Sequence, residues 1–327
     1  MSAEPVTYRQ ALREGLRTAL AADERTFLMG EDVGAYGGCF AVSLGLLEEF
    51  GPDKVRDTPL SESAFVGAGV GAAIGGQRPI VEIMTANFSL LALDQIMNNA
   101  ATLHHMSGGQ FSVPLVIRMT TGAGRQLAAQ HSHSLEAWYA HIPGLRIVCP
   151  ATVEDAAGML LGAIADPDPV LIFEHGALFT LKGELPDGPR PVDLDRARTH
   201  REGSDVTVVT HGACLHTSLA AAEQLDLDGV SVEVIDLRTL RPLDEATFLD
   251  SLRRTGWLVV VEDGWRSGGI GAEVAARVAE HGFWDLDAPI ERVATAEVPI
   301  PYAKHLEEAA LPSVDDVVAA IRRATGP

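Results

Sequence analysis

Apolar residues along the chain follow two alternating patterns. Short runs of consecutive apolar residues are typical of strands buried on both faces of a sheet. Longer segments carry apolar residues three or four positions apart, which is the spacing of one helix face. In the first half of the chain these patterns predict strands at 27–30, 79–84, 113–119, 146–149 and 170–174, and helices at 7–20, 44–50, 90–100 and from Thr152.

The alternation stops between Lys182 and Gly203, where prolines, glycines and charged residues predict an extended linker. It then resumes, with strands predicted at 206–210, 232–235, 257–261 and 290–293 and helices at 213–225, 244–254, 271–281 and 313–323. Strands alternating with helices predict an α/β fold of two domains, each a mostly parallel sheet with helices on both faces. We place these domains at 1–185 and 204–327, joined by the linker 186–203.

A helix is also predicted after Pro59, and its composition is unusual. No charged residue follows Glu62 until Arg78. Ser61 is a candidate N-cap of this helix. Glycines recur every four residues and share one helix face, where they allow another backbone to approach closely; they are Gly67, Gly71 and Gly75.

Glu62 itself has two interpretations. An acid in the first turn of a helix is favoured by the helix macrodipole and needs no other role. A carboxylate set in an apolar wall is instead desolvated, which favours its protonated form and makes it a candidate proton partner. The residues alone leave both interpretations open.

Composition and charge exclude several function classes. The 327 residues are 46% hydrophobic and 21% charged, which is typical of a globular protein with a large core. The net charge of −20 disfavours binding to nucleic acid or to an anionic membrane. Three cysteines lie far apart and are expected to be buried residues in a reducing compartment. No signal peptide or membrane-spanning pattern is recognised, so we expect a soluble cytoplasmic protein.

The motifs that the sequence lacks exclude other chemistry. The glycine clusters at 67–71 and 268–271 do not match G-x-G-x-x-G, and the chain contains no Walker lysine and no G-x-S-x-G motif. His131 and His133 have no third ligand at zinc-like spacing. We interpret His133 as a structural residue.

Several separated motifs, in order and at matching spacing, resemble the β subunit of the E1 component of 2-oxo acid dehydrogenase complexes. They are Glu31-Asp32-Val33-Gly34, Asp57-Thr58-Pro59-Leu60-Ser61-Glu62, Glu82-Ile83-Met84-Thr85-Ala86-Asn87-Phe88 and Ala129-Gln130-His131-Ser132. The resemblance covers nearly the whole chain. It implies a transketolase-like pyrimidine-binding domain followed by a transketolase C-terminal-like domain.

The resemblance also implies the active-site residues. Glu62 would hydrogen-bond the pyrimidine ring of thiamin diphosphate and act in proton transfer, with Leu60 beside it in the cofactor site. Phe88 would stack against the same ring. His131 would exchange a proton with substrate, for which a histidine pKa near neutrality is suited.

A structural monovalent cation, K⁺, is implied at a second place. The family binds it with main-chain carbonyl oxygens, and hard cations prefer such oxygen ligands. The matching positions are Leu115, Ala163, Ile164, Asp166 and Asp168. Asp168 stands where relatives often have asparagine.

The resemblance implies the function of a thiamin diphosphate-dependent E1. Pyruvate is the first choice of substrate, which gives pyruvate dehydrogenase (acetyl-transferring), on the route from glycolysis to acetyl-CoA. The family's G-D-G motif for Mg²⁺ and diphosphate is absent, which implies that an α subunit supplies it in an α2β2 heterotetramer with a second β subunit. An E2 acyltransferase would accept the acyl group on its lipoyl group. Branched-chain oxo acids or acetoin remain alternative substrates, and half of a split transketolase-like transferase or a non-catalytic scaffold remain alternative functions.

Overall fold

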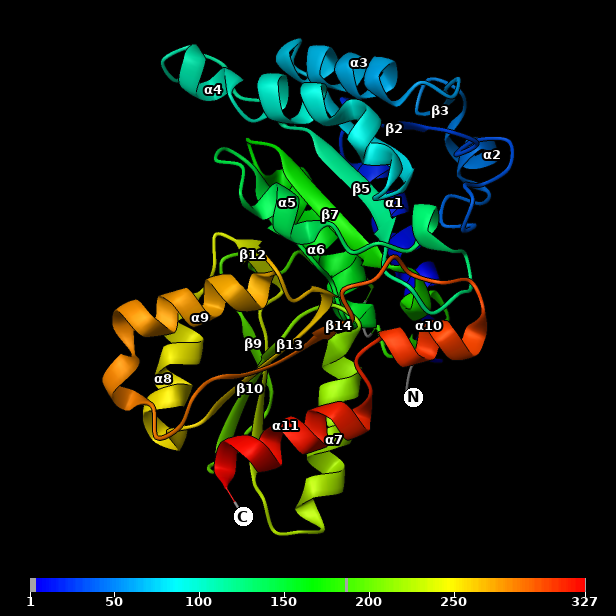
Figure 1. The fold of residues 1–327 in the computed structure, drawn as a ribbon. Coiled ribbons are helices and arrows are strands. Elements are labelled where there is room, and N and C mark those ends of the chain that lie inside the picture. Colours follow the sequence, from blue (N-terminus) through cyan, green and yellow to red (C-terminus); the bar gives the residue numbers. More distant parts are fainter. Residues whose placement is uncertain (1–3, 186–187, 327) are drawn as a thin grey trace. The chain divides into compact units, whose positions relative to one another are not determined.

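The computed structural model describes residues 4–185 and 188–326, and these form two compact units (Figure 1). Unit 1 comprises the described residues within Met1–Thr121 and Trp138–Leu194, and unit 2 those within Gly122–Ala137 and Asp195–Pro327. Each unit is an α/β structure around its own sheet, as the alternating pattern predicts. Residues 186 and 187 of the predicted linker lie outside the described part.

Unit 1 is built on six parallel strands in the order β6-β7-β5-β4-β2-β3. Its strands are β2 (Thr26–Gly30), β3 (Val55–Asp57), β4 (Arg78–Thr85), β5 (Val116–Thr121), β6 (Arg146–Val148) and β7 (Val170–His175), with a small antiparallel pair of β1 (Val6–Thr7) and β8 (Lys182–Gly183). Nearly every residue of the parallel strands is buried, because helices cover both faces.

The helices of unit 1 lie on opposite sides of this sheet (Figure 1). On one side α1 packs closely on α6: a Cβ added at Gly15 would lie 3.2 Å from Leu160. On the other side α3 packs on β4. The helices are α1 (Tyr8–Ala22), α2 (Leu46–Phe50), α3 (Glu62–Ile74), α4 (Leu103–Met106), α5 (Glu136–Ala140), which runs from unit 2 into unit 1, and α6 (Val153–Ala165), with short turns η1 (Phe88–Ala92), η2 (Gln95–Ala100) and η4 (Gly176–Thr180).

Buried charges join three neighbouring strands of the unit 1 sheet. Arg118 of β5 donates from Nε and Nη2 to the carboxylate of Glu174 on β7, at 2.8 and 2.5 Å. Its Nη1 donates to Glu82 on β4. All three side chains are almost fully buried, and desolvation raises the pKa of both acids. Such a group specifies which strands are neighbours, since leaving any member unpaired in the interior is costly.

Unit 2 has a five-stranded sheet in the order β14-β13-β10-β11-β9, parallel except for β9. Helices α7 and α11 lie on one side of it and α8 and α9 on the other (Figure 1). The elements are η3 (Ala129–His131), β9 (Arg198–Arg201), β10 (Val206–Thr210), α7 (Cys214–Asp226), β11 (Val232–Asp236), β12 (Thr239–Arg241), α8 (Glu245–Thr255), β13 (Leu258–Trp265), α9 (Ile270–His281), η5 (Phe283–Asp285), β14 (Glu291–Thr295), α10 (Lys304–Ala310) and α11 (Val314–Thr325).

Parts of the predicted linker 186–203 are structured. Val192 and Leu194 pack against α6, where a Cβ added at Gly158 or Gly162 would lie 2.6 Å from Val192 or 3.1 Å from Leu194. Residues 198–201 form the edge strand β9. The prolines end regular structure locally, but they do not prevent the chain beyond them from packing.

Four local expectations need correction. The predicted helix at 90–100 is a 3₁₀ turn followed by a π-helical turn. Ser61 is the N-cap of α3, but its side chain makes no capping hydrogen bond. Of the predicted glycine series, Gly67 lies close to a neighbouring element, since a Cβ there would lie 3.1 Å from Gln95, whereas one at Gly71 meets no described atom within 4 Å. The close contact with the sheet is made by Gly69, outside the series, where a Cβ would lie 2.7 Å from Val81. Cys39 is exposed, while Cys149 and Cys214 are buried as expected.

Candidate active site

The candidate residues of unit 1 follow the carboxyl ends of adjacent strands. Glu31 comes directly after β2, Glu62 lies shortly after β3, and Phe88 lies shortly after β4. Since β3, β2 and β4 are neighbours and parallel, these three segments emerge at the same edge of the sheet. Ligands of open α/β sheets bind at this edge.

Glu62 begins α3, and it is only 7% exposed although its side chain is an acid. The carboxylate of Glu62 has no hydrogen bond or ion pair with any residue in the described part of the chain. A buried acid without an internal partner is costly for stability, which argues for a functional rather than a structural role. Between the two interpretations of Glu62, its burial therefore favours the candidate proton partner.

Glu31 forms an acidic pair with Glu62. It is 5% exposed, and neither carboxylate oxygen has a hydrogen-bond partner within residues 4–185 and 188–326. Burial raises the pKa of Glu31 to about 7, and the negative charges of Glu62 and Asp32 add to this shift. Near neutral pH, Glu31 therefore holds a proton in much of the population.

Asp57, the last residue of β3, organises the loop that follows Glu31. Its carboxylate accepts hydrogen bonds from the main-chain N–H groups of Gly34 and Ala35, at 2.6 and 3.0 Å. The Thr58 N–H donates to the carbonyl of Gly30 at 2.9 Å. These hydrogen bonds connect the carboxyl end of β2 to the carboxyl end of β3. They therefore fix the positions of the two chain segments that lead to Glu31 and Glu62.

Leu60 and Phe88 are the other predicted cofactor contacts in unit 1. Leu60 is 80% exposed, and Phe88 is half-buried at the start of η1. A large apolar side chain exposed beside a buried acid is available for contact with a ligand or a second subunit. Ser89, next to Phe88, is fixed by a 2.5 Å hydrogen bond between its hydroxyl and that of Tyr139.

His131 belongs to unit 2, whereas Glu62 belongs to unit 1. It ends η3 and is half-buried. Ala128 before this turn has a positive φ of 63°. His133, two residues on, contacts the Trp265 ring with centroids 4.8 Å apart, and burial lowers the pKa of His133. This fits the expectation that His133 is structural.

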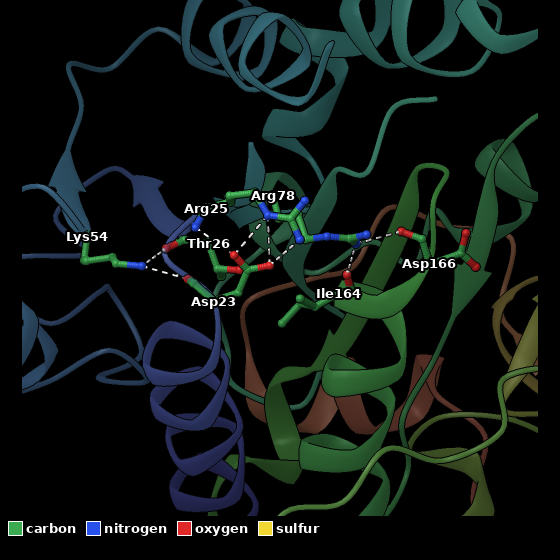
Figure 2. Close-up of polar contacts among 7 residues, drawn as sticks. All are labelled: Asp23, Arg25, Thr26, Lys54, Arg78, Ile164 and Asp166. Carbon is green, nitrogen blue, oxygen red and sulfur yellow. Dashed lines mark hydrogen bonds and ion pairs between the residues drawn. The ribbon is translucent and has the colours of Figure 1, made fainter. Parts of the chain in front are cut away.

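The predicted cation residues gather at the opposite edge of the unit 1 sheet. Leu115 and Asp168 precede β5 and β7, and the others end α6. Figure 2 shows Arg78, at the start of β4, pointing at this group: its Nη1 donates to the carbonyls of Ile164 at 2.5 Å and Asp166 at 3.4 Å. The group therefore lies away from the edge that carries Glu31 and Glu62.

The oxygen atoms of this group suit a monovalent cation. Carbonyls at the carboxyl end of α6 carry the negative end of the helix dipole. Asp168 Oδ1 is buried and has no hydrogen-bond partner among the described residues; His104 Nδ1 lies 3.8 Å away. The carbonyl oxygens of Ile164 and Asp166 would each contact both Arg78 and the cation. The two lone pairs of a carbonyl oxygen permit this.

Comparison with known proteins identifies the family. Residues 4–180 match the transketolase pyrimidine-binding domain, and residues 195–317 match the transketolase C-terminal domain. The chain is 47% identical to the mitochondrial pyruvate dehydrogenase E1 component subunit beta-2 of Oryza sativa subsp. japonica, covering 99% of this chain and 87% of the rice protein. It is 45% identical to the E1 component subunit beta of Rickettsia felis, covering 97% and 98%.

The chain belongs to the pyruvate dehydrogenase E1 β-subunit family. Among solved structures, a chain described as a split gene transketolase, inactive beta4 tetramer, superposes with a TM-score of 0.80 over 98% of both chains at 22% identity, which shows the shared fold. The predicted fold class and family are thereby confirmed.

The sequence motifs of the E1 β family reveal some residues of the candidate site and leave others unidentified. Glu62, Phe88 and His131 were found because they stand in recognisable motifs. Glu31 also stands in one of these motifs, and its position directly after a buried strand is the signal in the sequence that could have identified it. Asp57 was missed as a functional residue because its role depends on the backbone that folds around it.

Proposed function

We propose that this chain provides the pyrimidine half of a thiamin diphosphate site in a pyruvate dehydrogenase E1, completed by an α subunit that holds Mg²⁺ and the diphosphate. The observation that carries the proposal is Glu62: a buried acid that has no hydrogen-bond or ion-pair partner among residues 4–185 and 188–326, at the ligand-binding edge of a parallel sheet. The bound cofactor supplies the electron sink that decarboxylation of a 2-oxo acid requires.

The residues of the chain have separate tasks in this proposal. Glu62 holds a proton against the pyrimidine ring, where burial strengthens the interaction. Phe88 offers an aromatic face to the ring, and Leu60 helps to exclude water. Glu31, whose pKa is about 7, is protonated in about half of the population at neutral pH and so limits the negative charge beside Glu62. His131 gives or takes a proton at the substrate.

Subunit assembly is part of the same proposal. The face of α3 that bears Ala64, Ala68 and Gly71 is exposed and uncharged, and Leu91 of η1 nearby is 64% exposed. Exposed apolar surface of this kind marks contacts with other chains. We infer an α2β2 heterotetramer that contains a second β subunit and passes its acyl group to the lipoyl group of an E2 acyltransferase.

The experiment is to co-purify the chain with its α subunit and to assay dye reduction with pyruvate, 2-oxoisovalerate and acetoin in turn. We expect pyruvate to be preferred. Replacing Glu62→Gln should lower turnover by about 10²- to 10⁴-fold, as for loss of an acid–base partner, while the exposed Glu48→Gln control keeps wild-type rates. Near-normal turnover by an assembled Glu62→Gln enzyme would refute the proposal.

We also propose that K⁺ binds at the end of α6, through Leu115, Ala163, Ile164, Asp166 and Asp168. A cation there neutralises converging oxygen atoms, so the melting temperature should be higher in KCl than in tetramethylammonium chloride at equal ionic strength. Asp168→Ala should lose that difference. If wild type melts at the same temperature in both salts, Arg78 and Arg146, which pairs with Asp166 at 2.9 Å, neutralise the helix end without a cation, and the cation site is refuted.

Cellular location remains a prediction. No helix in the described ranges 4–185 and 188–326 is both long enough and apolar enough to cross a membrane. The relatives include mitochondrial and bacterial proteins. We retain a cytoplasmic location as part of the proposal, and cell fractionation followed by immunodetection tests it.

A further inference from the structure

The loop that carries His131 has an unfavourable backbone. Residues Gly122, Gly124, Gln126 and Ala128 all have positive φ values, of 81°, 95°, 54° and 63°. L-residues such as Gln126 and Ala128 rarely adopt this conformation, because the Cβ atom crowds the backbone. A loop of this kind keeps one conformation only if its surroundings hold it there.

One buried carboxylate of unit 2 holds the beginning of the loop. Glu307, on α10, is 0% exposed. Its Oε1 accepts the main-chain N–H of Gly124 at 3.0 Å and that of Gln126 at 3.2 Å, and its Oε2 accepts the Gln126 side-chain Nε2 at 2.6 Å. The charge of Glu307 is thus compensated by loop donors rather than by an arginine or lysine in the described residues.

The other end of the loop is held independently. Trp265, at the end of β13, contacts the His133 ring, and its own Nε1 donates to the Val298 carbonyl at 3.0 Å. His131 lies between these two attachment points. The tryptophan restrains the chain after His131, and Glu307 restrains the chain before it.

We propose that Glu307 is a positioning residue for His131. The proposal rests on the proposed role of His131 at the substrate. Glu307 does not itself touch the reacting atoms; it stabilises the strained segment 124–128, and this fixes where η3 begins and where the imidazole lies. Charge-assisted hydrogen bonds are roughly twice as strong as neutral ones, which suits a carboxylate to this task.

The test compares Glu307→Gln with Glu308→Gln in the chain co-purified with its α subunit. Both oxygens of Glu307 accept hydrogen bonds, so a glutamine must direct an amide N–H at a loop donor. We expect hydrogen–deuterium exchange at Gly124 and Gln126 to rise at least about tenfold, and kcat with pyruvate to fall by about ten- to a hundredfold, in line with the effect of small misplacements. Glu308 is exposed beside Lys304, and its variant should match wild type in both measurements.

A double-mutant cycle with His131→Ala separates positioning from a general loss of stability. If Glu307 acts through His131, then Glu307→Gln should lower kcat little further in the His131→Ala background. Unchanged exchange at Gly124 and Gln126, or fully additive losses of kcat, would overturn the proposal. Should the wild-type complex turn over no 2-oxo acid, the proposed function fails, whereas the exchange measurement still decides whether Glu307 holds the loop.

Discussion

At the scale of single residues, the proposed function rests on two buried acids that lack partners in the described part of the chain. Glu82 and Glu174 are as buried as Glu31 and Glu62, but they share Arg118. Glu31 and Glu62 have no such cation among the described residues. Buried acids of this kind occur in proteins where a ligand supplies the missing hydrogen-bond partner or a bound proton neutralises the charge.

Glu31 predicts a specific pH dependence of stability. Its pKa is about 7 in the folded chain against an ordinary 4.5, so the folded state binds more protons than the unfolded state between these values. The free energy of unfolding must therefore fall as pH rises through this window. The substitution Glu31→Gln removes the acid and with it the fall in the free energy of unfolding. It should therefore stabilise the chain at pH 8.5 by up to about 3 kcal/mol, with little effect at pH 4.5.

Urea unfolding of wild type and Glu31→Gln at both pH values provides the measurement. The matched control is Glu48→Gln, which changes an exposed acid and should behave as wild type at both. If the Glu31→Gln variant is no more stable than wild type at pH 8.5, then ionising Glu31 costs the folded state no free energy, and the prediction is wrong.

At the scale of elements, α3 shows how packing assigns roles to glycines that look alike in sequence. The every-fourth-residue pattern pointed to Gly67, Gly71 and Gly75, whereas the close approach to the sheet is made by Gly69. The period of a helix shows which residues share a face. It does not show which face meets the sheet when every residue around the helix is apolar or glycine, as in α3 after Ser63.

Two alanine substitutions in α3 should therefore have opposite effects. Gly69→Ala places a methyl group 2.7 Å from Val81 and should destabilise the chain by about 1–3 kcal/mol. Gly71→Ala meets no described atom within 4 Å, and it should stabilise the helix by up to about 1 kcal/mol. Chemical denaturation of the full chain measures both, and equal effects of the two substitutions would contradict this packing.

At the scale of the whole molecule, the two units are interleaved in the sequence. Residues 122–137 belong to unit 2, although unit 1 precedes and follows them. The chain therefore passes between units more than once, not only near the predicted linker. Periodicity could not reveal this, because a loop without regular structure shows no pattern that assigns it to one core or the other.

This interleaving predicts how a fragment should behave. Residues 1–194 contain unit 1 and the His131 loop but lack Glu307 and Trp265. We expect the fragment to fold, and trypsin to cut after Arg125 at least about tenfold faster than in the full chain, because the strained loop has lost its support. Arg146, half-buried in β6, serves as the internal control and should stay uncut. Equal protection of Arg125 in both proteins would show that the loop needs no support from unit 2.

The sequence by itself determined the alternation of strands and helices, the family and the motif residues Glu62, Phe88 and His131. These depend on local periodicity and on short motifs, which are carried by neighbouring residues. Only the tertiary structure decided that Glu31 is a buried acid without a hydrogen-bond partner in the described ranges, that Gly69 is where α3 approaches the sheet, and that Glu307 holds the His131 loop. Each of these depends on which distant segments meet, and hydrogen bonds between residues 181 to 183 positions apart leave no periodic pattern in the chain.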